Sequence, residues 1–324
     1  MLSRLKSHAV NFYCNTSMIY KTTKSNNRLQ RPMEFFGQYT GLPAPILAGN
    51  DWDKLCKEQP DQPFKEFKCP FSHNTINCNK IRKAQPNPLI GNCVVRHCPK
   101  DEPDQDWIVC PKRFLQDLTV FTDCKSLLNP KCKEIYLAQE VELAGYGNLD
   151  FALIGYDESG DVLDFLAIEV QSMGTSSSGS IWTARNDYLN GKLKDKYMYG
   201  LNQKDASKKI MVQLLHKGAQ VARWRFRLVL LVQDYFLDHL RIAYNLETHF
   251  HEEDKQDFVY IYSYQLLFDE NKNKFYLQKK ESLSTDIIGL SMALISNPNT
   301  GYIEFSHIAS KIQSKKSKGE LMQL

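Results

Sequence analysis

Two apolar stretches joined by a short polar segment constrain the fold of this chain more than any other feature. Residues 151–156 (FALIGY) and 162–170 (VLDFLAIEV) are rich in the aromatic and branched side chains of buried strands. Residues 157–160 (DESG) contain Asp and Gly, which tolerate the backbone angles of a tight reversal. The sequence therefore predicts a β-hairpin over residues 150–171.

Two carboxylates and one amide fall at the open end of this hairpin. With the turn centred on residues 157–160, Asp150 lies opposite about position 167, one diagonal step from Glu169. Glu169 and Gln171 are two residues apart on one strand and therefore share a face. A carboxylate in an apolar strand is costly unless a cation or a donor satisfies it, and Mg²⁺ prefers carboxylate oxygen. We therefore expect a magnesium site here.

Strands and helices follow one another from residue 133 onward. We predict strands near 139–144, 150–156, 162–171, 223–233, 257–264 and 274–278, and helices near 204–217, 284–296 and 302–314, with Gly218 ending the first helix and a Ser/Gly-rich loop at 174–179. This pattern predicts an α/β fold, with a mixed sheet flanked by helices, over residues 133–315. No run of about 18 apolar residues occurs, so no membrane span is expected.

Both ends of the chain are basic. Residues 1–33 contain Lys and Arg but no acid and are predicted to be a disordered leader; the alternatives are that Met33 is the true start, or that the leader contacts DNA. Residues 316–324 are predicted to be a basic tail. The net charge of +4 and the pI of about 8.4 are compatible with a nucleic-acid partner without requiring one. In the absence of a secretory signal we expect a cytoplasmic location.

Residues 34–132 form an irregular, cysteine-rich region. The chain has nine cysteines, and all but Cys14 lie between Cys56 and Cys132. Without a secretory signal, a metal site is a better explanation than disulfides. No C-x-x-C pair occurs, but four thiolates in a tetrahedron suit zinc or iron. The alternative is that the cysteines are small buried hydrophobes. The candidate ligands are Cys69, Cys78, Cys93, Cys98 and Cys110.

Several motifs, in order along the chain, resemble those of the NotI-like type II restriction endonucleases. The resemblance covers residues 35 to about 235 and is specific as a set, although each motif alone is weak. The motifs are Phe35-Phe36-Gly37, Cys69-Pro70-Phe71, Cys78-Asn79-Lys80, Gly91-Asn92-Cys93-Val94-Val95, Cys110-Pro111-Lys112-Arg113-Phe114, Asp150, Glu169-Val170-Gln171, Asn202, Lys208-Lys209 and Gln213-Leu214-Leu215-His216-Lys217.

This resemblance implies a nuclease core of the PD-(D/E)xK superfamily, in the variant with Gln instead of the usual Lys. The catalytic residues would be Asp150, Glu169 and Gln171, with Mg²⁺ on Asp150 and Glu169. A structural iron, or zinc as the chemical alternative, would be held by four cysteines: Cys69, Cys78, Cys93 and Cys110. Cys98, beside His97, is a competing fourth ligand. The enzyme would be a homodimer that cuts duplex DNA at a palindromic, GC-rich site and acts beside a cognate DNA methyltransferase.

Further polar residues are candidates for the same site. Glu142 or Glu140 would complete the metal shell, unless they form a solvated strand face. Lys209, Gln213 and Lys217 recur at four-residue steps and share a helix face, which is either part of the site or a solvent stripe. Lys209 is the alternative to Gln171 as the residue that activates water.

Two other readings of the sequence stay open. Basic and apolar residues alternate over 223–228, as expected for a strand whose cationic face contacts phosphate or for a charge-protected edge strand. The alternatives to a restriction enzyme are a non-enzymatic, metal-stapled DNA-binding protein and a repair nuclease without base-specific readout.

Overall fold

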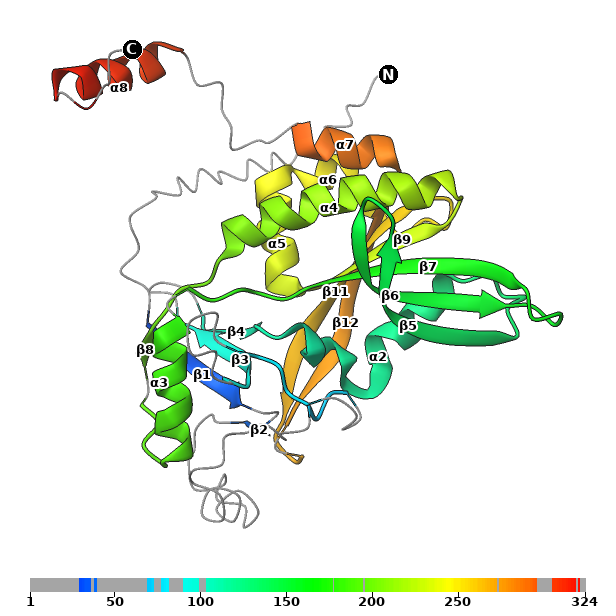
Figure 1. The fold of residues 1–324 in the computed structure, drawn as a ribbon, viewed down its shortest axis with the longest axis horizontal. Helices are drawn as coiled ribbons and strands as arrows, with labels where there is room; N and C mark the ends of the chain where they lie inside the picture. The colour runs from blue at the N-terminus through cyan, green and yellow to red at the C-terminus, as the bar shows by residue number, and fades with distance from the viewer. Residues whose placement is uncertain are drawn as a thin grey trace, which may run out of the picture.

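A seven-stranded mixed sheet forms the centre of the molecule (Figure 1). The computed structural model describes residues 29–35, 38–39, 69–72, 77–81, 90–98, 103–176, 178–194, 196–272, 274–295, 305–318 and 320. The order of the strands is β10-β12-β11-β9-β7-β6-β5. Their bounds are β5 (Glu134–Leu143), β6 (Gly147–Tyr156), β7 (Val162–Gln171), β9 (Arg227–Gln233), β10 (His251–Glu252), β11 (Val259–Asp269) and β12 (Lys274–Thr285). The neighbours β7, β9 and β11 run parallel, and the other pairs are antiparallel.

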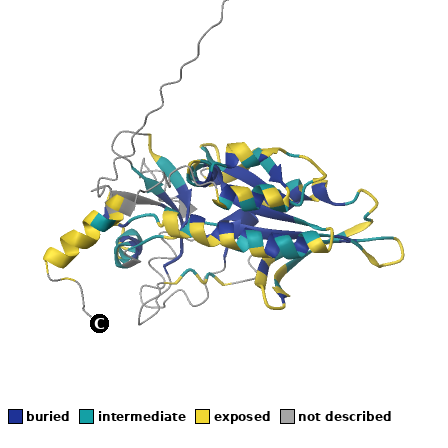
Figure 2. Ribbon diagram, turned by 90° about the horizontal axis from the view of Figure 1, so that it is seen from above, coloured by how far each residue is buried: buried dark blue, intermediate teal, exposed yellow. Residues whose placement is uncertain are grey.

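Helices cover both faces of this sheet. One layer contains α4 (Gln203–Arg223), α5 (Asp234–Tyr244), α6 (Leu246–His249) and α7 (Ile287–Ile295). The other contains η2 (Pro111–Leu118), α2 (Thr119–Cys124) and η3 (Lys125–Leu127). Along β9, Leu228 packs in the α4 core and Val229 in the α2 core, as expected for a strand buried on both faces. Figure 2 shows the strands mostly buried between these layers. The predicted α/β fold is confirmed.

A smaller sheet contains the described strands of the cysteine-rich region. Its order is β2 (Gln38–Tyr39), β1 (Leu29–Phe35), β3 (Asn92–His97) and β4 (Gln105–Ile108), and β8 (Tyr197–Met198) pairs with β1 beside α3 (Ser178–Leu189). One backbone hydrogen bond and one hydrogen bond to a side chain join this small sheet to the large sheet. The N–H of Met173, just past β7, donates to Ile108 O at 2.8 Å, and the N–H of Ile108 donates to Gln233 Oε1 at 2.7 Å. The small sheet therefore adjoins the carboxyl ends of β7 and β9.

Gly218 does not end the helix that the sequence predicts, because α4 continues to Arg223. The glycine lies where the helix crosses the sheet. A Cβ at this position would be 3.3 Å from Val259 Cγ2 and 3.5 Å from Ile287 Cδ1. Gly218 therefore allows the helix to pack closely against its neighbours. Because of this packing the glycine does not end the helix.

The predicted strand over 223–233 is wrong in its first residues. Arg223 ends α4, Arg225 has a φ of 62° in the following turn, and β9 begins at Arg227. The alternating basic residues therefore do not share one strand face. The edge-strand alternative is wrong as well, since β9 lies between β7 and β11.

Ordered elements extend into three segments predicted to be irregular. β1 begins at Leu29, inside the predicted leader, with Met33 fully buried; residues 1–28 lie outside the described part. α3 begins at Ser178, inside the predicted loop, and α8 (Phe305–Ser317) reaches into the predicted tail. Pairing of β1 with β3 and β8 explains the first difference, because tertiary pairing outweighs local composition. Among the described helices, none is long and apolar enough to cross a bilayer.

Candidate active site

The hairpin of β6 and β7 places Asp150 directly opposite Glu169. The last ladder pair is Phe151 with Ile168, and Asp150 and Glu169 are the next residues on the two strands. The predicted register, with Asp150 opposite position 167, is therefore wrong by two residues. The turn closes from Asp157 to Asp161, and the register shifts between Gly155 and Tyr156. An error of two preserves the alternation of faces, so the two carboxylates are neighbours as expected.

Each of the two acids is fixed by the backbone of the opposite strand. The N–H of Val170 donates to Asp150 Oδ2 at 2.8 Å, and the N–H of Asp150 donates to the Glu169 carboxylate. These bonds continue the hairpin where the ladder itself stops. The Glu169 side chain is buried, with 3% of its surface exposed, whereas Asp150 is exposed to solvent. A ligand from solution therefore reaches the pair from the Asp150 side.

Protein atoms that displace water from the two carboxylates raise the pKa of both acids. The pKa of Glu169 is raised to about 7, chiefly because burial disfavours the charged form, and the hydrogen bond from Lys217 opposes this shift. The pKa of Asp150 is raised by the same cause, while the Val170 N–H and the charges of Lys217 and Lys209 oppose it. A divalent cation would relieve this cost for both acids, because it stabilises the ionised form.

Lys217 is the cation that contacts Glu169 in this structure. Its Nζ lies 2.7 Å from Glu169 Oε1 and donates to Asn148 O at 2.6 Å. Gln171 lies half-buried at the end of β7, and its Nε2 donates to the carbonyl of Ser172. In the sequence, Lys217 shares a candidate helix face with Lys209 and Gln213, and the four-residue spacing does not distinguish it from them. The adjacent Gly218 is the signal that marks where α4 approaches the sheet.

Of the two further acids, the structure brings Glu140 and not Glu142 towards Asp150. Leu149 and Phe151 pair with Val141 and Gln139, so Glu140 lies opposite Asp150, and its charge raises the pKa of Asp150. Glu140 has a φ of 51°, a left-handed conformation inside the strand.

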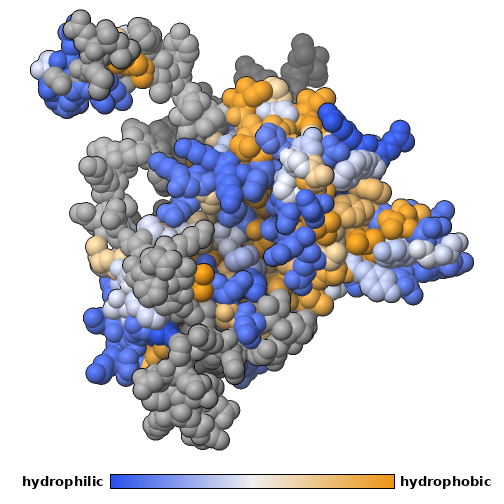
Figure 3. Space-filling view, viewed as in Figure 1, coloured by the Kyte–Doolittle hydropathy of each residue, from blue (hydrophilic) through white to orange (hydrophobic). Residues whose placement is uncertain are grey.

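Glu142 instead pairs with Asn148 and is exposed. Lys209 and Gln213 lie on α4, exposed and half-buried, at four-residue steps before the buried Lys217. Figure 3 shows hydrophilic side chains over the amino-terminal half of this helix.

Three of the four predicted cysteine ligands, Cys69, Cys78 and Cys110, interact through their charges. The thiols of Cys110 and Cys69 both raise the pKa of Cys78, although burial is the largest cause of the shift. The backbone N–H groups of Lys80 and Lys112 donate to the sulfurs of Cys78 and Cys110, respectively. N–H groups aimed at sulfur stabilise a thiolate, the form that binds metals.

The fourth predicted ligand, Cys93, makes a different contact. Its side chain is buried, and its Sγ donates to Gly91 O at 3.5 Å. Cys98 is five residues further along the direction of β3, about 16 Å away by strand geometry, and its thiol neighbours Asp104 and Arg96. Cys98 is therefore distant from Cys93, the other candidate for the fourth ligand. Within the described residues, no three Cys, His, Asp or Glu side chains are grouped so that they could hold a metal ion.

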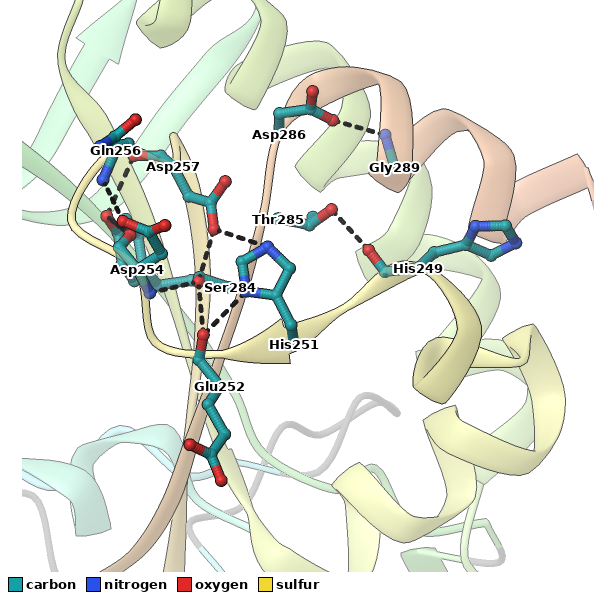
Figure 4. Close-up of polar contacts among 11 residues, drawn as sticks. His249, His251, Glu252, Asp254, Gln256, Asp257, Ser284, Thr285, Asp286 and Gly289 are labelled. Carbon is teal, nitrogen blue, oxygen red and sulfur yellow. Dashed lines mark hydrogen bonds and ion pairs between the residues drawn. The ribbon is translucent and has the colours of Figure 1, made fainter.

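A second polar cluster lies at the other edge of the large sheet, between β10 and β12 (Figure 4). Ser284 Oγ donates to Asp257 Oδ2 at 2.6 Å, and His251 Nε2 lies 3.2 Å from the same oxygen. Ser284 also accepts from the N–H of Asp254 at 2.8 Å. The serine proton is therefore directed at the aspartate and not at the histidine, unlike the arrangement that activates a serine nucleophile. The cluster fastens the turn before β11 to β12.

The sequence matches a known protein family over most of its length. No curated protein matches the chain. The family model "Restriction endonuclease NotI" matches residues 53–277, more than half of the chain, and this range includes the acidic pair, Lys217 and the four predicted cysteine ligands. The chain therefore belongs to the NotI family of restriction endonucleases.

Proposed function

We propose that this protein hydrolyses duplex DNA at a magnesium site formed by Asp150 and Glu169, in a core of the PD-(D/E)xK type. Membership of the NotI family makes it a restriction endonuclease that cuts DNA. The observation that carries the proposal is the pair of opposed carboxylates at the open end of the β6–β7 hairpin. The mixed sheet flanked by helices and Gln171, two residues after Glu169, support the superfamily assignment.

The donor set fits magnesium. Proteins commonly hold Mg²⁺ through one or two carboxylates, with waters and substrate phosphate in the remaining positions. Asp150 and Glu169 supply two hard oxygen donors, and Asp150 is open to solvent. When bound, the ion polarises the scissile phosphate and lowers the pKa of water.

The residues around the pair have distinct tasks in this proposal. Gln171 is neutral, so it orients water by hydrogen bonds and does not act as a base. Glu140, opposite Asp150, adds negative charge to the metal site. The exposed Lys209 and the half-buried Gln213 lie where α4 can contact phosphate oxygens.

A structural metal, iron or zinc, held by Cys69, Cys78, Cys93 and Cys110 is the second part of the proposal. The charge interaction among three thiols and the N–H groups directed at two sulfurs support it. Cys93, whose Sγ donates to Gly91 O, would supply the fourth thiolate.

The resemblance to the family suggests a GC-rich palindrome as the target, and the symmetry of such a site suggests the assembly. A type II enzyme that cuts both strands of a palindrome, here a GC-rich one, places one active site on each strand, and a homodimer matches the two-fold symmetry of such a site. The enzyme would act in the cytoplasm, where a cognate DNA methyltransferase protects the DNA of the cell.

Digestion of a large mixed DNA tests this function. Purified protein with Mg²⁺ should produce discrete fragments, and EDTA should abolish cleavage. A smear, or intact DNA with every divalent ion tried, would contradict a site-specific, metal-dependent nuclease. The Asp150→Asn variant is the matched control, because it keeps the size of the side chain and removes a charged metal ligand.

A further inference from the structure

Lys217 joins the two strands that carry the acidic pair. Its ammonium group contacts Glu169 Oε1 of β7 at 2.7 Å and the Asn148 carbonyl of β6 at 2.6 Å. Only 5% of the Lys217 surface is exposed. Lysine is rarely buried to this extent unless it is paired. Because Asn148 is two residues before Asp150, the two bonds fix Glu169 relative to the strand that positions the other carboxylate.

Neither of the other candidates makes this contact. The side-chain N–H of Gln171 donates to Ser172 O. Lys209 is exposed and lies eight residues before Lys217, about 12 Å along the helix. Its charge acts on Asp150 from a distance. The helix is close enough at Lys217 because Gly218 packs directly against Val259 and Leu228.

We propose that Lys217 is a positioning residue of the nuclease site, which supplies from α4 the ammonium group that position 171 lacks and holds the Glu169 carboxylate opposite Asp150. This inference rests on the proposed function of the acidic pair. The Glu169–Lys217 bond holds one carboxylate oxygen, and the Lys217–Asn148 bond prevents the ammonium from following Glu169 if the carboxylate turns. A helix that contributes no metal ligand therefore acts with the strand backbone to hold the two carboxylates opposed.

Two substitutions separate this role from simple filling of space. Lys217→Met keeps the length of the side chain without donors, and Lys217→Arg keeps charge and donors but is larger. If Lys217 only fills space, Met is tolerated better than Arg. A positioning role predicts the opposite order of single-turnover cleavage at saturating Mg²⁺: wild type, then Arg, then Met, with Met slower by about 10²-fold or more.

Calcium binding without DNA provides a readout that is independent of cleavage. Calorimetry should show affinity falling in the same order, because the carboxylates are no longer held opposed. Lys204→Met is the matched control and should bind calcium as the wild type does. Lys204 is an exposed lysine in the first turn of the same helix, and its charge acts on His239. If the Met variant does not fold, Lys217→Gln replaces it, with cleavage expected below that of Arg.

The outcomes distinguish this inference from the proposed function. The proposed function is refuted if the wild-type protein does not cut DNA with Mg²⁺. It is also refuted if the Asp150→Asn variant cuts DNA as fast as the wild type. Wild-type protein that cuts, beside a folded Met variant within threefold of its rate, overturns only the role of Lys217. A Met variant that binds calcium as tightly as the wild type or more tightly also overturns it, because Lys217 would then merely compete with the metal.

Discussion

At the residue scale, the candidate site depends on two carboxylates that lie opposite each other on neighbouring strands. Glu169 is buried, and Asp150 is exposed to solvent. The proposed metal would bind the ionised form of Glu169, and burial raises the pKa of this group to about 7. Below that pH the proton competes with the metal, and above it the competition ends.

Calcium affinity should therefore fall about tenfold per pH unit below pH 7 and level off above it. Calorimetry of the wild-type protein between pH 5.5 and pH 8.5, at constant ionic strength, measures this. In the Glu169→Gln variant the remaining affinity should lose this dependence. An affinity that is flat across neutral pH in the wild type would mean that Glu169 is not a ligand.

Gln171 provides the second residue-scale prediction. If its amide orients the attacking water, Gln171→Ala should lower the single-turnover rate by about 10²–10⁴-fold, the range for a positioned catalytic group. DNA binding in calcium should not change. Two results together would contradict this role: a Gln171→Ala enzyme that cuts at the wild-type rate, and a folded Lys209→Ala enzyme that does not cut. They would mean that Lys209 on α4, and not Gln171, acts on the attacking water.

The acidic pair Asp150 and Glu169 could be predicted from the sequence, but the contact of Lys217 with Glu169 could not. Strand alternation and turn residues identify the hairpin, and an error of two in register leaves Asp150 beside Glu169. The spacing of Lys209 and Lys217 shows only that they share a helix face. Which one reaches Glu169 depends on where α4 crosses the sheet, and this is set by tertiary packing.

At the scale of elements, α4 positions the site because it packs closely on the sheet at Gly218. Gly218→Val should destabilise the protein by about 1–3 kcal/mol, the usual cost of extra methyl groups in a packed core. A Cβ there already meets Val259 and Ile287 within 3.5 Å. Thermal unfolding measures the effect, with the exposed Val212→Ala on the same helix as the control. Equal melting temperatures for Gly218→Val and the wild type would contradict the close approach.

The cysteine-rich elements provide a separate test. Protein purified without chelator should contain about one iron or zinc per chain if four thiolates form one site. Cys69→Ser, Cys78→Ser, Cys93→Ser and Cys110→Ser should each lose the metal, whereas Cys98→Ser should keep it. Elemental analysis decides this. Active protein with far less than one equivalent of metal would show that these cysteines are only buried side chains.

The elements also show where local sequence signals are outweighed. β7 has the predicted bounds, because a continuous apolar run is buried on both faces of the sheet. The segment 223–228 alternates like a strand, yet the end of α4 and a turn occupy most of it, since β9 must pair between β7 and β11. Alternation of residue types over a short segment carries no information about these long-range strand pairings.

At the scale of the whole molecule, the two sheets meet beside the active site. The Met173–Ile108 backbone bond lies two residues after Gln171 and two residues before Cys110. Gln233, at the end of β9, contacts the backbone of β4 on the same side. The cysteine-rich region therefore supports the strand end that carries Gln171. If this region holds the proposed metal, loss of that metal should reduce cleavage as well as stability.

The central claim is that Asp150 and Glu169 together form the catalytic metal site. The most direct test is single-turnover cleavage of one DNA site at saturating Mg²⁺ by the wild type, Asp150→Asn and Glu169→Gln, with DNA affinity measured in calcium. Both variants should bind DNA like the wild type and cut at least about 10³-fold more slowly, because each lacks a charged ligand that stabilises the transition state. A variant that binds DNA and cuts at a rate close to that of the wild type would contradict the account.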